Sequence, residues 1–204
     1  MDAREQANRL LDLQKMLLQF LEIERLIYLP DGTRTDRRET DTEHSFHLAM
    51  LAWFLSEHYP HLDQSKVVQY ALAHDLVEIY AGDVMAIGRT AEQQRIKKQR
   101  EKEALERLEN EWPDFPSLIQ TIKEYEDGQT PESSFVRALD KIMPMMHQLL
   151  SAGKTWKKLD VRRSDVIKNK DEKTARSKEI HAIWKVLREE IQAHDDWFNP
   201  KNAD

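Results

Sequence analysis

Two histidines and two aspartates interrupt apolar stretches of this sequence. His74 and Asp75 stand side by side in YALAHDLVEIYAGD, and His44 lies thirty residues before His74. Asp140 interrupts FVRALDKIM. A carboxylate in such surroundings costs several kcal/mol unless it is paired or bound to a metal. Each position alone fits a hydrogen-bonded core histidine or a capped aspartate, but together the four predict one shared cation.

The donor set narrows the identity of that cation. Imidazole and carboxylate without thiolate suit Mn, Co, Fe, Ni or Zn better than Ca. On a continuous helix, His74 and Asp75 would point about 100° apart. Both would then reach one ion only if it lay between their two directions, with His44 and Asp140 supplied by neighbouring helices.

Two further carboxylates follow His74 and could carry acid-base chemistry. Glu78 comes four residues after His74, on the same face of the expected helix. Asp83 follows Ala81-Gly82, where glycine allows the chain to turn. Carboxylates beside a metal can exchange protons with a bound water. The alternatives are a surface carboxylate for Glu78 and a turn-stabilising side chain for Asp83.

Helices must position these side chains, because the apolar residues recur at helical spacing. The expected helices cover 5–28, 43–58, 64–80, 91–111, 117–126, a segment that begins after Thr130, and 172–193. No strand is expected, and residues 30–42 are expected to form a polar loop. Pro144 falls inside one expected helix, where it either ends the helix or re-aims Asp140. The prediction is one all-α domain of six or seven helices over 1–204.

Composition agrees with a helical fold and excludes several classes of function. The chain has 204 residues, 33% charged residues, five glycines and no cysteine, and its net charge is -6. The absence of cysteine excludes disulfides, thiolate metal sites and thiol nucleophiles. The negative charge disfavours nucleic acid and anionic membranes as partners. The sequence shows no signal peptide or membrane-spanning run, so a cytoplasmic location is expected.

Three segments resemble the HD-domain metal-dependent phosphohydrolases, and within them most closely the bacterial HD-type 5'-deoxynucleotidase group. They are TEHSFHLAMLA, ALAHDLVEIYAGDV and TPESSFVRALDKI. The resemblance covers roughly residues 10–150, which would form the core of a single HD-domain helical bundle. Residues 151–198 would then be a helical extension. The resemblance also implies a homodimer, and the apolar first or last helix could supply its interface.

The resemblance assigns a role to each candidate residue. It implies that His44, His74, Asp75 and Asp140 are the metal ligands. Glu78 and Asp83 match the catalytic acidic positions. Arg25 and Arg38 match the arginines that bind the substrate phosphate, with Arg34 and Arg37 as rivals for Arg38. His47 is expected to pack or to support the site rather than to bind the metal.

The spacing of the histidines favours a single metal. No histidine lies between Asp75 and Asp140, where two-metal HD phosphodiesterases carry additional ones. The resemblance implies that the reaction is release of phosphate from a (deoxy)nucleoside 5'-monophosphate. Three alternatives stay open: an HD phosphatase acting on another phosphorylated metabolite or nucleotide, a non-catalytic metal-binding protein, and a nucleic-acid-binding protein that uses the basic residues of 154–178.

Overall fold

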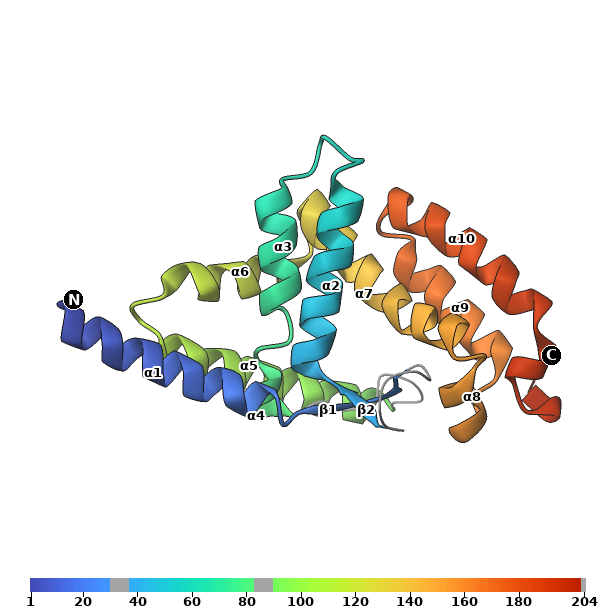
Figure 1. Cartoon of the computed structure of the whole chain (residues 1–204), viewed down its shortest axis with the longest axis horizontal. Coiled ribbons are helices and arrows are strands. Elements are labelled where there is room, and N and C mark those ends of the chain that lie inside the picture. Colours follow the sequence, from blue (N-terminus) through green and yellow to red (C-terminus); the bar gives the residue numbers. More distant parts are fainter. Residues whose placement is uncertain (30–36, 83–89, 203–204) are drawn as a thin grey trace.

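The computed structural model describes residues 1–29, 37–82 and 90–202, and its fold is helical (Figure 1). In chain order the elements are α1 (Ala3–Phe20), β1 (Glu24–Tyr28), β2 (Arg38–Thr40), α2 (Asp41–Ser56), α3 (Gln64–Ala73), α4 (Glu78–Ala81), α5 (Ala91–Glu111), α6 (Pro116–Asp127), α7 (Pro131–Leu150), α8 (Lys154–Lys158), α9 (Arg163–Thr174), α10 (Lys178–Ala193) and the 3-10 turns η1 (Asp195–Trp197) and η2 (Pro200–Asn202). The expected all-α class is confirmed. The described ranges contain ten α-helical segments rather than six or seven, because α4, α8 and α9 are additional pieces.

A two-stranded antiparallel sheet replaces the end of the expected helix 5–28. Helix α1 stops at Phe20, and β1 pairs with β2 so that Glu24 faces Thr40 and Tyr28 faces Arg38. The backbone amide of Asp41 also donates to the carbonyl of Ile23 at 2.9 Å. The pairing partner lies beyond residues 30–36, so the local pattern of leucines gave no sign of it.

The expected helix 64–80 is also divided. Helix α3 ends at Ala73, and residues 74–77 form a turn before α4 begins at Glu78. In that turn the amides of Leu76 and Glu78 bond to carbonyls three residues back, at 3.2 and 2.9 Å. The expected angle of about 100° between His74 and Asp75 assumed a continuous helix, which the structure interrupts at this point.

Two clusters of buried apolar residues hold the helices together. One lies among α1, α4, α5 and α6, and it includes Phe20, Leu108 and Ile122. The other surrounds α7, and it joins Leu48 of α2 to Trp184 of α10. Figure 1 shows α1 and α10 at opposite ends of the molecule, with α2, α3 and α7 between them. The central helices are thus the ones that carry the predicted ligands.

Helix α7 runs without interruption through Pro144. The proline lacks the amide that would bond the carbonyl of Asp140, but the flanking turns remain helical. Of the two expectations for Pro144, the helix break is wrong. Within the described ranges, no helix combines the length and the apolarity that crossing a bilayer requires.

Candidate metal centre

The beginning of α2 fixes the direction of His44. Thr40 caps the helix, since its hydroxyl accepts from the amide of Glu43 at 3.3 Å while the Glu43 carboxylate accepts from the amide of Thr40 at 3.0 Å. Arg37 clamps the same carboxylate, and its hydrogen bonds lower the pKa of Glu43 to about 2. This reciprocal cap sets where the helix starts and turns His44 into the interior, where it is fully buried.

The end of α3 fixes the tautomer of His74. Its Nδ1 lies 3.0 Å from the carbonyl oxygen of Ala71. A carbonyl only accepts, so Nδ1 carries the proton and Nε2 of a neutral ring carries a lone pair. That Nε2 is buried and makes no hydrogen bond, yet it lies 3.1 Å from Oδ2 of Asp75. Two acceptors at this distance repel each other unless a cation lies beside them.

The other two predicted ligands approach the same point. Nε2 of His44 lies 3.1 Å from Oδ1 of Asp140 and 4.0 Å from Oδ2 of Asp75. The ring centroids of His44 and His74 are 5.4 Å apart. The ligand atoms of His44, His74 and Asp75 lie within 4.8 Å of one another. An orphaned buried nitrogen among nitrogen and oxygen donors fits a divalent transition metal.

The charges around this point favour a cation. Burial would raise the pKa of Asp140, but Lys141 and His44 outweigh it and hold that pKa well below its ordinary value. Burial and Arg25 would lower the pKa of His44, but its hydrogen bond with Asp140 and the nearby carboxylate of Glu39 raise it to about 9. The carboxylate of Asp140 therefore favours its ionised form, and the negative charge gathered around His44 suits a cation.

Arg25 touches the predicted centre directly. Its Nη1 donates to Oδ2 of Asp75 and to Oδ1 of Asp41, each at 2.8 Å, and its Nε lies 3.7 Å from Oε2 of Glu39. Sequence reasoning missed Glu39 and Asp41, which are both fully buried. Both are acidic residues just before the EHS motif. They fall in the range that was expected to be a polar loop, where burial of a carboxylate was not expected.

Three of the four predicted ligands open into a pocket of about 440 Å³, whereas the fully buried His44 is not among its lining residues. His74, Asp75, Glu78 and Asp140 line it, and Glu78 is itself buried and paired with Lys97 of α5. The lining also contains many basic side chains, namely Arg25, Lys97, Lys98, Arg137, Lys141, Lys173 and Arg176. Sequence reasoning had assigned only Arg25 to this site, and it had noted Lys173 and Arg176 only as part of the basic range 154–178. Isolated basic residues on charged helices look like solvated surface.

Known proteins resemble this chain in sequence and in fold. The HD domain family matches residues 25–184. A crystal structure of a predicted metal-dependent phosphohydrolase from Magnetospirillum magnetotacticum MS-1 superposes with a TM-score of 0.77 at 31% identity. The superposition covers 94% of this chain and 96% of that one. This chain belongs to the HD-domain family of metal-dependent phosphohydrolases.

Other relatives of this HD domain are more distant. The 5'-deoxynucleotidase HDDC2 of Xenopus laevis is 26% identical over 142 residues, which cover 66% of this chain and 69% of that protein. The protein of the same name from Bos taurus is 29% identical over 50% of this chain and 49% of its own length. A conserved hypothetical protein from Pyrococcus furiosus shares the fold, with a TM-score of 0.60 at 20% identity.

The remaining predicted site residues of the HD domain do not join the pocket in the described structure. Asp83 and Arg34 lie outside the described residues. The guanidinium of Arg38 lies above the ring of Tyr28, 5.9 Å from its centroid, and Arg38 does not line the pocket. Arg37 is occupied with Glu43. Of the predicted phosphate arginines and their rivals, only Arg25 lines the pocket among the described residues.

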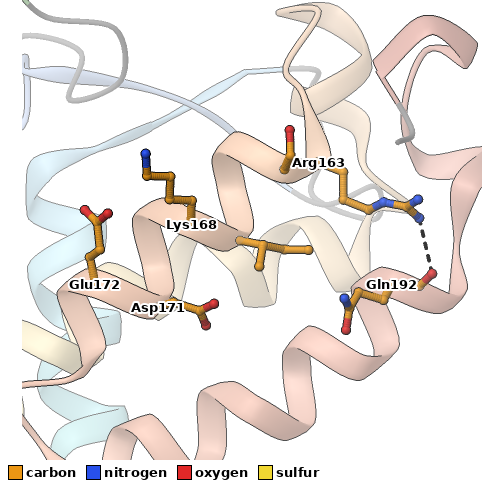
Figure 2. Close-up of a pocket in the computed structure, with 7 residues that line it drawn as sticks. Arg163, Lys168, Asp171, Glu172 and Gln192 are labelled. Atoms are coloured by element: carbon orange, nitrogen blue, oxygen red, sulfur yellow. Dashed lines mark hydrogen bonds between the residues drawn. The ribbon is translucent and has the colours of Figure 1, made fainter.

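A second groove lies on the C-terminal part of the HD domain, between α9 and α10 (Figure 2). Its wall includes Arg163, which donates to the carbonyl of Gln192 at 3.2 Å, and the exposed Lys168. The residues that line it include no histidine. This groove therefore lacks the donor set that distinguishes the predicted centre.

A buried lysine of α9 gives a stability prediction. Burial lowers the pKa of Lys170 to about 7, assisted by the charges of Lys141 and Lys173. Between pH 7 and 10.5 the unfolded chain therefore binds more protons at this position than the folded one, and folding loses stability as pH falls through this window. Lys170→Met should raise the free energy of unfolding by roughly 2 kcal/mol near pH 7, or about 4–8 °C in Tm.

Urea unfolding at pH 6.5 and pH 9 measures this effect, and the gain should shrink at the higher pH. Lys168→Met on the exposed side of the same helix is the matched control and should change stability little. A Lys170→Met protein with no gain at pH 6.5, or with an equal gain at both pH values, would contradict the prediction.

Proposed function

We propose that this HD domain releases phosphate from nucleoside 5'-monophosphates, with deoxynucleotides as the first candidates. One observation carries the proposal. His74 Nε2 and Asp75 Oδ2 face each other at 3.1 Å beside His44 and Asp140, at the wall of a pocket rich in basic side chains. The name 5'-deoxynucleotidase, carried by relatives at 26–29% identity, supports this substrate class.

The proposed ligands are His44, His74, Asp75 and Asp140, which would hold one ion of Mn, Co, Fe, Ni or Zn. Such an ion supplies Lewis acidity toward a phosphate oxygen and toward a water molecule. Arg25 is held by Asp41 and Asp75 with its guanidinium at the pocket, and we propose that it offsets charge on the phosphoryl oxygens.

Glu78 is the proposed proton carrier. It is buried at the pocket and its carboxylate is paired with Lys97. In the proposed reaction water attacks phosphorus, the bond from phosphorus to the 5'-oxygen breaks, and the water proton passes to a carboxylate. A proton returned to the 5'-oxygen completes the nucleoside. Asp83, outside the described residues, is the proposed partner for the second transfer.

A second candidate substrate is a phosphorylated metabolite or nucleotide with more negative charge. The pocket's basic residues come from α5, α7 and the segment around α9, and a single phosphate does not need all of them. A non-catalytic metal-binding role is less well supported, because buried Glu78 lines the same pocket.

One experiment tests the metal and the substrate together. The purified protein is analysed for bound metal, stripped with chelator, and reloaded separately with Mn, Co, Fe, Ni and Zn. Phosphate release is then followed on deoxynucleoside and ribonucleoside 5'-monophosphates, their di- and triphosphates, and sugar phosphates. The proposal expects metal-dependent turnover fastest on the monophosphates. Turnover without metal, or none on any phosphorylated compound, would contradict it.

We also propose that the chain forms a homodimer through α2. Large apolar side chains follow its outer face at helical spacing, with Trp53 at 50% and Phe54 at 64% exposure beside Phe46 and Met50. A stripe of this kind usually marks a contact surface. The sequence had pointed to the first or the last helix as the interface. The exposed leucines of α1 make the first helix an alternative contact surface.

A cytoplasmic location stays a prediction.

Trp53→Glu should shift the protein from dimer to monomer, because a buried charge at a subunit interface has no partner. Light scattering after gel filtration, over a range of protein concentrations, measures the change. Val186→Glu, on the exposed face of α10, is the control and should leave the mass unchanged. If the Trp53→Glu variant stays dimeric while Val186→Glu becomes monomeric, the interface lies on the last helix, α10, rather than on α2.

A further inference from the structure

Glu39 of β2 has an unusual environment. It is fully buried, and neither of its carboxylate oxygens has a hydrogen-bond partner among the described residues. Oε2 faces the predicted centre, 3.5 Å from Nδ1 of His44 and 3.7 Å from Nε of Arg25. Oε1 faces the other way, toward two histidines that the proposed function does not use.

Those two histidines come from the helices that carry the predicted ligands. His47 follows His44 by one turn of α2, and its Nδ1 lies 3.5 Å from Oε1 of Glu39. His147 follows Asp140 by two turns of α7, and its Nε2 lies 3.8 Å from the same oxygen. The two rings stand nearly perpendicular, with centroids 6.1 Å apart. One donor atom from each of the three residues lies within 4.8 Å of the others.

We propose that Glu39, His47 and His147 form a second binding site for a divalent transition metal, zinc or nickel by their donor set. Zinc bonds imidazole nitrogen and carboxylate oxygen at about 2.0–2.2 Å, so neighbouring ligand atoms of a tetrahedral site lie about 3.3–3.6 Å apart. The separations of 3.5 and 3.8 Å are close to this spacing. They are too long for ordinary hydrogen bonds, which measure about 2.7–3.2 Å.

Two of the three side chains are shielded from water, because Glu39 is fully buried and His147 is 8% exposed. The Nδ1 atom of His147 is also buried without a hydrogen-bond partner. The half-exposed side chain of His47, at 45%, gives an ion a route from solvent.

This site differs from a two-metal centre in which ions share ligands in one cleft. Here the imidazole of His44 separates the two ions, because its Nε2 faces Asp140 and its Nδ1 faces Glu39. Glu39 therefore contacts both proposed metal sites. Its Oε2 supports the ligand His44 of the first site, and its Oε1 is a ligand of the second. The second site does not depend on the proposed function, because none of its ligands is assigned to the reaction.

Counting bound metal in matched variants tests the proposal. Full-length protein without a histidine tag is stripped with chelator and titrated with Zn²⁺ in a calorimeter, and the metal retained after gel filtration is measured. Wild type should bind two equivalents and His47→Ala one. His58→Ala, which removes an exposed histidine just beyond α2, should still bind two. Asp75→Asn should lose the other equivalent, and Asp75→Asn with His47→Ala should lose both.

The absorption of bound Co²⁺ gives an independent readout, since His47→Ala should remove one of two sets of bands. A wild-type protein that binds one equivalent, or a His47→Ala variant that keeps both, would overturn the proposal. Loss of one equivalent in His58→Ala would also overturn it, because the extra ion would then be a surface contaminant. If Asp75→Asn keeps phosphohydrolase activity while His47→Ala loses one equivalent, the proposed function fails and the second site stands.

Discussion

Asp75→Asn should reduce phosphate release by at least about 1,000-fold, because a metal's Lewis acidity contributes several kcal/mol to such a reaction. Oδ2 of Asp75 faces His74, His44 and the guanidinium of Arg25. An amide at this position removes the negative charge while keeping the shape of the side chain. Metal content and kcat/KM on a deoxynucleoside monophosphate should therefore fall together.

The control for Asp75→Asn is Asp127→Asn. Asp127 is an exposed aspartate at the end of α6 that is not among the residues lining the pocket, and the same chemical change there should leave metal and activity intact. Circular dichroism confirms that both variants keep their helices. If the Asp75→Asn protein is folded, binds as much metal as the wild type and is fully active, the assignment of His74 and Asp75 to the metal centre is wrong.

Glu78→Gln should lower kcat by about 100- to 10,000-fold, the range that a positioned proton carrier contributes. Metal content should stay at the wild-type level, because Glu78 pairs with Lys97 and is not among the predicted ligands. KM should change little, since the substitution removes proton transfer rather than binding. This pattern separates the effect of Glu78→Gln from that of Asp75→Asn.

Glu101→Gln is the matched control for Glu78→Gln. Both carboxylates pair with Lys97, but Glu101 lies on α5 and its side chain is 31% exposed. An equal loss in both variants would show that Lys97, rather than Glu78, is the group that matters. Full activity of Glu78→Gln would leave Asp83 as the only proposed proton carrier.

Local patterns predicted several of the long helices, and they pointed to polar side chains that the fold brings together. The range 91–111 agrees with α5, and the Thr130-Pro131 signal marks the beginning of α7. Polar residues in apolar helices pointed to His44 and Asp140, which the fold brings to 3.1 Å. Helix boundaries and buried polar positions can be predicted locally, because helix caps and the cost of burying charge act over a few residues.

Features that depend on distant partners could not be predicted in the same way. The strand pair requires β1 to meet β2 across residues 30–36, and the burial of Glu39 depends on that pairing. The turn at 74–77 interrupts a pattern that is helical on both sides. The basic wall of the pocket gathers Lys98, Arg137 and Arg176 from separate elements, which no spacing in the sequence could signal.

The basic residues of the pocket and the predicted ligands come from different parts of the chain, which affects how the substrate preference of such a protein could change in evolution. The predicted ligands come from α2, the end of α3 and α7, whereas Lys173 and Arg176 reach the pocket from the C-terminal segment. That segment also buries Trp156 and Trp184 in the core around α7, so it cannot be deleted without loss of stability. Exchanges at positions 173 and 176 alone, however, would alter which phosphorylated compound is admitted while the reacting groups stay the same. Selectivity and chemistry can therefore evolve as separate traits within one fold.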